Sequence, residues 1–171
     1  MKRIALPLLF TFFGICQTFS QPWQIGHVST TFTDVDRGNR SIPTEIYYPA
    51  LTAGDGVAVA GNSGEQFPVI TFGHGFFMSW AVYDYFWQTV VPEGYIVAFP
   101  TTEMSLLSPS HGDFGDDLAF LVGAIQALGN DSVSLFYDKV SVLSGFMGNS
   151  MGGGSAILGA VNFTGLTRTV K

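Results

Sequence analysis

Cysteine and positive charge are scarce in this sequence, and each shortage excludes a class of function. Cys16 is the single cysteine among 171 residues, so the chain has no pair for a disulfide and no cysteine cluster for a metal. Seven lysines and arginines stand against thirteen aspartates and glutamates, a formal net charge of −6. Such an acidic chain is a poor ligand for nucleic acid or for an anionic membrane surface. We therefore expect no nucleic-acid partner.

Cofactor motifs are also lacking, although the chain contains 21 glycines. A phosphate-binding loop needs lysine and then serine or threonine after its second glycine, but Gly153 is followed by Gly154. A dinucleotide-binding turn needs G-x-G-x-x-G with an acidic residue about 20 positions later, and that spacing does not occur. No histidines and carboxylates share the spacing of metal ligands. The sequence thus predicts neither a cofactor nor a bound metal.

The first 20 residues predict a secretory signal peptide. A basic start precedes an apolar run over residues 4–15, and small and polar residues follow. The run is shorter than the ~20 residues that a membrane-spanning helix needs, so we expect cleavage after Ser20 and no stable membrane insertion. A lipid anchor on Cys16 would require a small residue before it, where Ile15 stands. The protein is therefore expected to be secreted or periplasmic.

Removal of residues 1–20 would leave residues 21–171 as one domain, large enough to bury a core. Its pattern begins with two strands around a turn and then alternates short apolar strands with helices. We expect strands over residues 25–34, 42–49, 67–72, 95–99 and 140–147, helices over 81–91, 113–128 and 156–161, and loops over 51–66 and 106–112. This order predicts a doubly wound, mostly parallel α/β sheet with an N-terminal antiparallel hairpin.

The most informative stretch is Gly148-Asn149-Ser150-Met151-Gly152, which fits the pattern G-x-S-x-G. In a nucleophile elbow this serine lies on a sharp turn between a strand and a helix, and the turn leaves no room for a Cβ on either side. A strand pattern precedes the stretch, and a small-residue helix follows it, with Gly153 and Gly154 expected to allow close approach. The alternative is a glycine-rich loop that only turns a corner. The flanking strand and helix favour the elbow.

Together these segments resemble an α/β-hydrolase. The resemblance rests on Gly73-His74-Gly75 after one strand, on the acidic stretch 113–117 that opens a helix, and on the elbow with its triple glycine. It covers about residues 42–161 and points to the secreted branch that contains poly(ethylene terephthalate) hydrolases, cutinase-like enzymes and chlorophyllase-like esterases. Asn149 departs from that branch, which often has histidine or tryptophan at this position.

The resemblance implies a role for three residues. Ser150 would be the acylated nucleophile, and the backbone N–H groups of Met151 and Phe76 would form the oxyanion hole. The side chains of Phe76 and Met151 would also line an apolar cleft for a small-molecule or polymeric ester. A buried core ring is an equal alternative for Phe76.

We expect the three histidines and the pair Arg37 and Arg40 to have structural rather than catalytic or ligand-binding roles. His27 is expected to be structural, and His74 to hold the oxyanion turn. His111 is expected in a solvated loop, with a role as catalytic base as the alternative. Arg37 and Arg40 are expected at a solvated hairpin tip rather than at a phosphate site.

The main difficulty is that no aspartate, glutamate or histidine follows Ser150. In α/β-hydrolases the acid and the base follow the nucleophile in chain order. One hypothesis is a secreted serine carboxylesterase whose sequence is incomplete here, truncated after the helix that follows the elbow. The other is a non-catalytic α/β binding module or gene remnant, since a serine without a base is a weak nucleophile. Either way, we expect this chain alone to be unstable and inactive on esters.

The signal-peptide interpretation predicts that the mature protein begins near Gln21. Intact mass and N-terminal sequencing of the exported protein should show a chain without Cys16, with identical mobility in the presence and absence of reductant. An intact Met1, or a lipid on Cys16, would show this prediction to be wrong.

Overall fold

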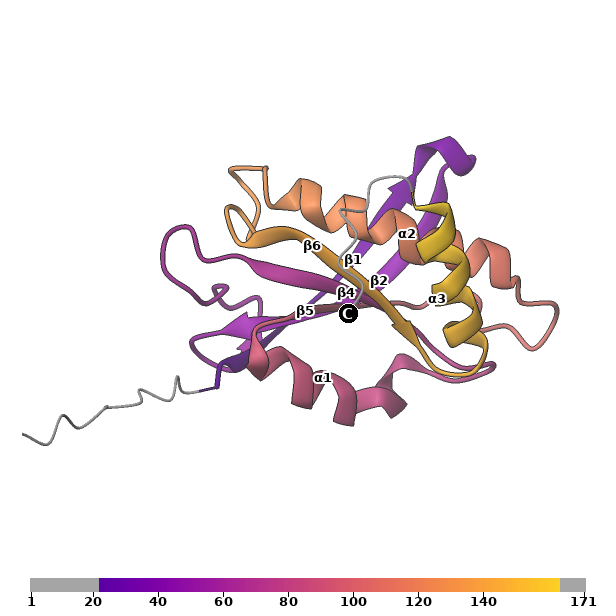
Figure 1. Ribbon diagram of the computed structural model, residues 1–171, viewed down its shortest axis with the longest axis horizontal. Helices are drawn as coiled ribbons and strands as arrows, with labels where there is room; N and C mark the ends of the chain where they lie inside the picture. The colour runs from indigo at the N-terminus through magenta and orange to yellow at the C-terminus, as the bar shows by residue number, and fades with distance from the viewer. Residues whose placement is uncertain (1–21, 164–171) are drawn as a thin grey trace, which may run out of the picture.

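Six strands form one mixed sheet, in the order β3-β1-β2-β5-β4-β6, in the computed structural model of the protein (Figure 1). The structure describes residues 22–163, so the expected signal segment and residues 164–171 lie outside the described residues. The strands are β1 (Gln24–Asp34), β2 (Arg40–Ala50), β3 (Gly54–Asp55), β4 (Phe67–Gly73), β5 (Ile96–Pro100) and β6 (Val140–Gly148). The helices are α1 (Asp84–Val90), α2 (His111–Leu128) and α3 (Met151–Asn162), with 3₁₀ turns η1 (Val35–Arg37), η2 (Trp80–Tyr83) and η3 (Val91–Glu93).

The strand pairing confirms the predicted α/β architecture. β1 and β2 form the predicted antiparallel hairpin, with Gln24 opposite Ala50 and Asp34 opposite Arg40. β2 continues the sheet by pairing antiparallel with β5, while β4 pairs in parallel with both β5 and β6. α1 covers one face of the sheet, and α2 and α3 cover the other (Figure 1). The described chain is therefore an α/β fold with a mixed, mostly parallel sheet.

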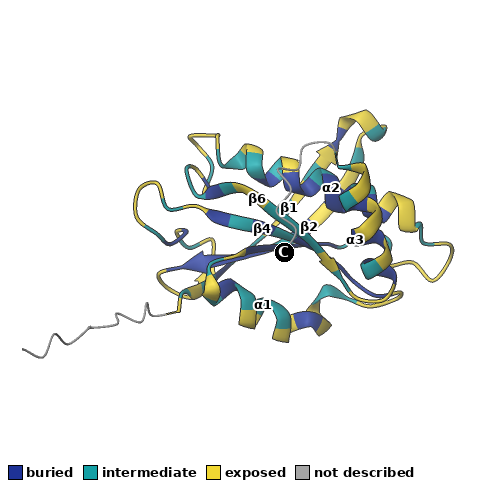
Figure 2. Cartoon of the chain, viewed as in Figure 1, coloured by how far each residue is buried: buried dark blue, intermediate teal, exposed yellow. Residues whose placement is uncertain are grey.

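Alternate residues of the same strands fill two apolar layers, one on each face. In β2, Ile46 and Tyr48 join the cluster on the α2 side, whereas Tyr47 between them joins the cluster on the α1 side. β5 repeats the pattern with Ile96 and Val97. This period of two is the strand geometry that the apolar runs predict. Burial of each such side chain stabilises the fold by about 1.5–3 kcal/mol. Figure 2 shows the central strands buried and the outer surfaces of the helices exposed.

Helix α2 begins at His111, two residues before the predicted start at Asp113. Ser110 is the reason, because its side chain caps the helix and accepts a hydrogen bond from the N–H of Asp113 at 3.1 Å. His111 therefore lies in the first turn of a helix, and its predicted position in a loop is wrong. The buried apolar residues of α2 recur at helical spacing and face the sheet: Phe114, Leu118, Leu121, Val122 and Ile125.

Two connections also differ from the prediction. The helix expected over residues 81–91 is shorter, because 3₁₀ turns flank α1 on both sides. The expected surface loop 51–66 folds back along the end of β2, where the N–H of Ala60 donates to the carbonyl of Pro49 at 2.8 Å. Val59 and Ala60 are consequently buried in the core. No helix within residues 22–163 is long and apolar enough to span a bilayer.

Strand β6 lies at one edge of the sheet and, among the described residues, pairs only with β4. Its side chains Val142 and Met147 are exposed, Val142 by 71%. On the adjacent helix α3, Ile157 and Val161 are exposed as well. No charged residue occurs from the start of β6 to the end of α3. An apolar edge without charges is a template for pairing with another chain.

Substitution Val142→Lys should therefore reduce self-association of the protein, because a charge on an edge strand opposes pairing between chains. The expected change is a smaller apparent mass at high protein concentration in sedimentation or light scattering. The folding free energy should shift by no more than about 0.5 kcal/mol, as is usual for exposed sites.

Val133→Lys is the matched control, because Val133 is 89% exposed and precedes β6. It adds the same charge away from the strand edge. Equal effects of the two variants would show that net charge, and not the edge of β6, governs self-association.

Candidate functional site

Ser150 lies in the sharp turn that joins β6 to α3. β6 ends at Gly148, α3 begins at Met151, and Ser150 is the residue that caps the helix. Its backbone has φ 51° and ψ −114°, a conformation that costs a non-glycine residue of order 1–3 kcal/mol. The side chain is exposed. The fold thus holds a serine hydroxyl outward on a strained strand-to-helix turn.

Glycines make this turn possible, because three backbone segments touch there. A Cβ on Gly152 would overlap the carbonyl oxygen of Gly73 at the end of β4, and a Cβ on Gly148 would overlap the backbone of Gly152. Gly153 and Gly154, predicted to allow close approach, are not the residues in contact, since a Cβ there would meet its nearest atoms at 3.3 Å and 3.7 Å. The close approach belongs to the glycines of the G-x-S-x-G pattern itself.

The two expected oxyanion donors lie at the ends of β4 and β6. Met151 is the first residue of α3, so its N–H has no acceptor within the helix. Among the described residues, no hydrogen-bond partner is found for the N–H of Phe76. The Phe76 side chain is 49% exposed, so it is not a core ring, whereas Met151 is buried. Two backbone donors and one open aromatic surface are therefore available near Ser150.

The turn that carries Phe76 is fixed by Tyr83 and His74. The Tyr83 hydroxyl accepts a hydrogen bond from the N–H of Gly75 at 2.8 Å and lies 3.3 Å from the amide oxygen of Asn149. The ring of His74 is fully buried, with Nδ1 2.9 Å from the carbonyl oxygen of Gly75. His74 holds this turn, as the sequence predicts. Tyr83 links the turn to the residue before Ser150.

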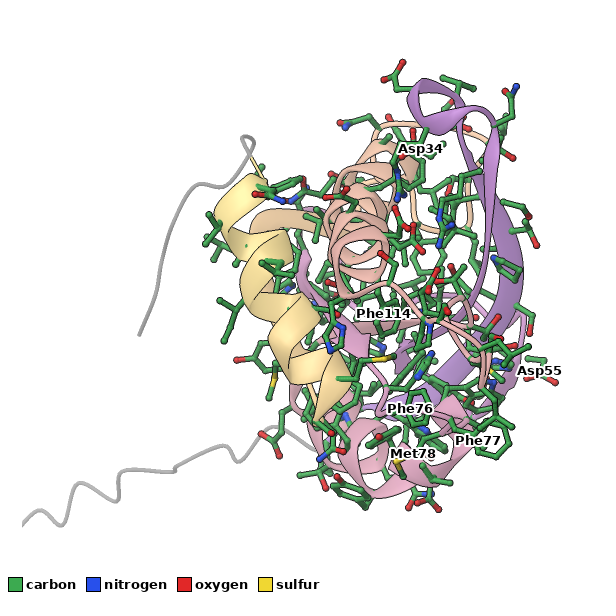
Figure 3. The ribbon with its side chains drawn as sticks, turned by 90° about the vertical axis from the view of Figure 1, so that its right-hand side faces the viewer. Asp34, Asp55, Phe76, Phe77, Met78 and Phe114 are labelled. Atoms are coloured by element: carbon green, nitrogen blue, oxygen red, sulfur yellow. The ribbon has the colours of Figure 1, made fainter. Side chains whose placement is uncertain are left out.

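Exposed apolar side chains surround this end of the sheet. Phe76, Phe77 and Met78 lie together at the end of β4 in Figure 3. The β5–α2 connection adds Leu106 and Leu107, which are also exposed. Exposed apolar patches on a folded protein mark surfaces for binding. We call these five exposed side chains the apolar rim, and it suits an apolar ligand more than a charged one.

The other two histidines, His27 and His111, differ in their surroundings. His27 lies between the carboxylates of Glu45 and Asp55 at 2.8 Å each and stacks on Tyr47, which fits its predicted structural role. His111 is exposed in the first turn of α2. Its Cδ2 would lie 3.7 Å from a Cβ on Gly154, one turn beyond Ser150. His111 is thus beside α3.

The prediction that Arg37 and Arg40 form a solvated hairpin tip is wrong. Both pair with the fully buried Asp117 of α2, and Arg37 also pairs with Asp34. Burial lowers the pKa of Arg37, but the hydrogen bonds that Arg37 donates to Asp34 and Asp117 outweigh it, and the net pKa is raised. The hydrogen bond with Asp117 is the main cause of the raised pKa of Arg40. The hairpin is anchored on α2, and both arginines remain charged.

Sequence reasoning also missed Asp117 itself. It falls on the same helical face as Phe114, Leu118 and Leu121, which the structure buries. A carboxylate on a buried face requires cationic partners. This requirement is the feature of the sequence from which the pairing of Asp117 could be predicted, and Arg37 and Arg40 are the cations that meet it.

Two open pockets elsewhere on the surface do not include the candidate site. One, of about 620 Å³, lies between the β1–β2 turn, α2 and the end of α3. The other, of about 400 Å³, lies over Tyr47 and Trp87 on the α1 face. Neither is lined by Ser150, Phe76 or Met151. The chemistry of Ser150, and not pocket size, identifies the candidate site.

Comparison with known proteins supports the fold. No protein-family model matches the chain, and no curated protein matches it at a significant level. Among solved structures the chain is similar to a ferulic acid esterase from Streptomyces cinnamoneus, with a TM-score of 0.59 and 15% sequence identity. The match covers 89% of this chain and 59% of the esterase, so the chain spans less than two thirds of that protein. At this identity the likeness shows the α/β fold alone.

Substitution Gly152→Ala should destabilise the protein by about 1–3 kcal/mol or more, because the added Cβ overlaps the carbonyl of Gly73 and forces backbone movement. Gly154→Ala is the matched control in the same helix, where the added Cβ meets Cδ2 of His111 at an ordinary contact distance of 3.7 Å. It should stabilise by up to about 1 kcal/mol through helix propensity. Denaturant unfolding of both variants measures the difference. A Gly152→Ala protein as stable as Gly154→Ala would contradict the tight backbone contact.

Proposed function

We propose that this chain carries the nucleophile and oxyanion hole of a secreted serine hydrolase that cleaves carboxylic esters through an acyl-enzyme. The observation that carries the proposal is the position of Ser150. Its exposed hydroxyl sits on a strained turn, beside the N–H of Met151 and close to the turn that carries Phe76. The esterase-type fold of the structural neighbour supports the same class of reaction.

In the proposed reaction Oγ of Ser150 attacks the carbonyl carbon of the ester, and its proton passes to a general base. The carbonyl oxygen becomes negative and is stabilised by the N–H groups of Met151 and Phe76. The alcohol then leaves with a proton, which gives an ester between the acyl group and Ser150. Water attacks this acyl-enzyme, releases the carboxylic acid and restores the serine hydroxyl. No cofactor or metal takes part.

The backbone donors suit this role because they are fixed before the substrate binds. Tyr83 and His74 hold the Gly75–Phe76 turn, and the contact between Gly73 and Gly152 sets its position relative to α3. Donors that need no reorganisation stabilise the transition state most, and loss of one typically costs 10²–10³-fold in rate. The same turn places the Phe76 ring on the apolar rim, where the acyl or alcohol part of an ester would bind.

The general base is the incomplete part of the proposal. No aspartate, glutamate or histidine follows Ser150 in this sequence. We infer that the acid and base come from residues beyond this chain, since the neighbouring esterase is considerably longer. His111, exposed beside the first turns of α3, is the alternative base.

A second candidate function is a non-catalytic binding module. The exposed side chains of Phe76, Phe77 and Leu107 favour it, because exposed apolar patches mark binding surfaces. The apolar rim would then bind an apolar ligand that is not hydrolysed. Ester turnover separates the two candidates.

A fluorophosphonate probe should label Ser150 in the protein that carries the complete acid and base, and the label should be lost in Ser150→Ala. Ser155→Ala is the control, because Ser155 is fully buried five residues along the same segment and should not be labelled. Peptide mass spectrometry locates the adduct. Labelling that persists in Ser150→Ala would overturn the assignment of the nucleophile.

Hydrolysis of p-nitrophenyl butyrate by residues 21–171 alone tests the source of the base. We expect no turnover above that of Ser150→Ala, because removal of the base leaves only the oxyanion and binding contributions. Turnover that depends on both Ser150 and His111 would instead assign the base to His111. Binding of the ester without turnover by the longer protein would favour the binding module.

A further inference from the structure

Asp117 is the most densely paired buried side chain among the described residues. It is fully buried, and Arg40 binds both of its oxygens, with Nε to Oδ1 and Nη2 to Oδ2 at 2.7 Å each. Arg37 also donates to Oδ1, and the Thr102 hydroxyl donates to Oδ2 at 2.6 Å. Charge-assisted, bidentate contacts of this kind are short and strongly directional. The carboxylate therefore fixes three elements at one point: the β1–β2 hairpin, α2 and the start of the β5–α2 connection.

The same arginine fixes the far end of that connection. Nη2 of Arg40 donates to Glu103 at 2.8 Å, and the other oxygen of Glu103 accepts a hydrogen bond from the N–H of Ser110 at 2.6 Å. Ser110 caps α2. Residues 101–110 are thus tied at one end to the buried carboxylate of Asp117 and at the other to the partly buried Glu103, although their tip is exposed.

From Thr102 the chain of contacts continues to the candidate oxyanion turn. Nε2 of His74 lies 2.8 Å from the Thr102 carbonyl oxygen, and Nδ1 lies 2.9 Å from the Gly75 carbonyl oxygen. The His74 ring is fully buried and contacts the ring of Phe114 at a centroid distance of 4.6 Å. Phe76 directly follows Gly75. A displacement of Thr102 would therefore move His74 and the N–H of Phe76.

We propose that Asp117 and Thr102 are positioning residues that set the Phe76 N–H through His74. The role of this N–H as an oxyanion donor rests on the proposed function. Fold stability alone gives a weak account of the arrangement, because a buried ion pair is often no more stabilising than packed apolar residues of the same volume. Four donors on the carboxylate of Asp117 instead fix the geometry of the backbone at the end of β4.

Thr102→Val tests the link with little change of shape, because it removes only the hydroxyl that binds Asp117. We expect amide hydrogen exchange at Gly75 and Met78, whose N–H groups are hydrogen-bonded within the turn that carries Phe76, to accelerate about tenfold, since loss of one hydrogen bond favours local opening. Exchange in the core strand β5 should not change. Thr102→Ser, which keeps the hydroxyl, should restore the slow exchange.

Thr101→Val is the matched control. Thr101 precedes Thr102, and its hydroxyl donates to the Pro43 carbonyl at 3.3 Å instead of to Asp117. It should leave exchange at Gly75 and Met78 unchanged. Equal acceleration by both variants, or none by Thr102→Val, would overturn the proposal, as would failure of Thr102→Ser to restore protection.

Asp117→Asn and NMR of the His74 ring give two further measurements on the intact chain. Asp117→Asn weakens the ion pairs and should accelerate exchange at both Gly75 and Met78. Nitrogen-15 spectra should show a proton on Nε2 of His74, because this nitrogen faces the Thr102 carbonyl oxygen and can bind it only as a donor. A His74 ring protonated on Nδ1 alone would overturn the proposal.

In the longer protein with esterase activity, Thr102→Val should lower kcat with little change in KM, because the Phe76 N–H acts on the transition state. A raised KM with unchanged kcat would overturn the proposal. If exchange responds as expected but Ser150 proves unreactive, the positioning network stands and the proposed function fails. The two inferences are therefore separable.

Discussion

The close contact between the backbones of Gly73 and Gly152 is the constraint on which the rest of the structure depends. It brings the end of β4 against the first turn of α3, so the turn before Phe76 and the turn at Ser150 become one local structure. The N–H of Asn149 donates to the carbonyl of Gly73 at 3.0 Å and reinforces the contact. A side chain at either glycine would separate Ser150 from the turn that carries Phe76. The contact is possible because neither Gly73 nor Gly152 carries a Cβ atom.

A second constraint is electrostatic, and it joins the β1–β2 hairpin to α2. The sheet and helices would pack through apolar contacts alone, yet α2 places a carboxylate on its buried face and the hairpin supplies two guanidinium groups to it. The acidic chain thus uses two of its few cations inside the fold rather than on its surface. The result is a rigid support around the β5–α2 connection, whose exposed tip carries much of the apolar rim.

The sequence predicted the parts of the molecule that depend on local pattern. Alternating and continuous apolar runs located the hairpin and strands β4, β5 and β6, and G-x-S-x-G located the turn at Ser150. It failed where partners lie far apart in the chain. Arg40 and Asp117 are 77 residues apart, and neither carries a local sign of the other. Likewise, the way in which α3 crosses β4 decides which glycines come into close contact, and the order of residues does not reveal that crossing.

The position of β6 in the sheet has a consequence for the order in which the protein folds. β6 joins by pairing with β4, so Val140 must meet Phe67 across about seventy residues, and closure of so long a loop is entropically slow. The hairpin, whose strands are joined by a five-residue turn (35–39), has no such delay. The turn that holds Ser150 is therefore among the last features to form. The β1–β2 hairpin can therefore be in place before the backbone geometry at Ser150 is set.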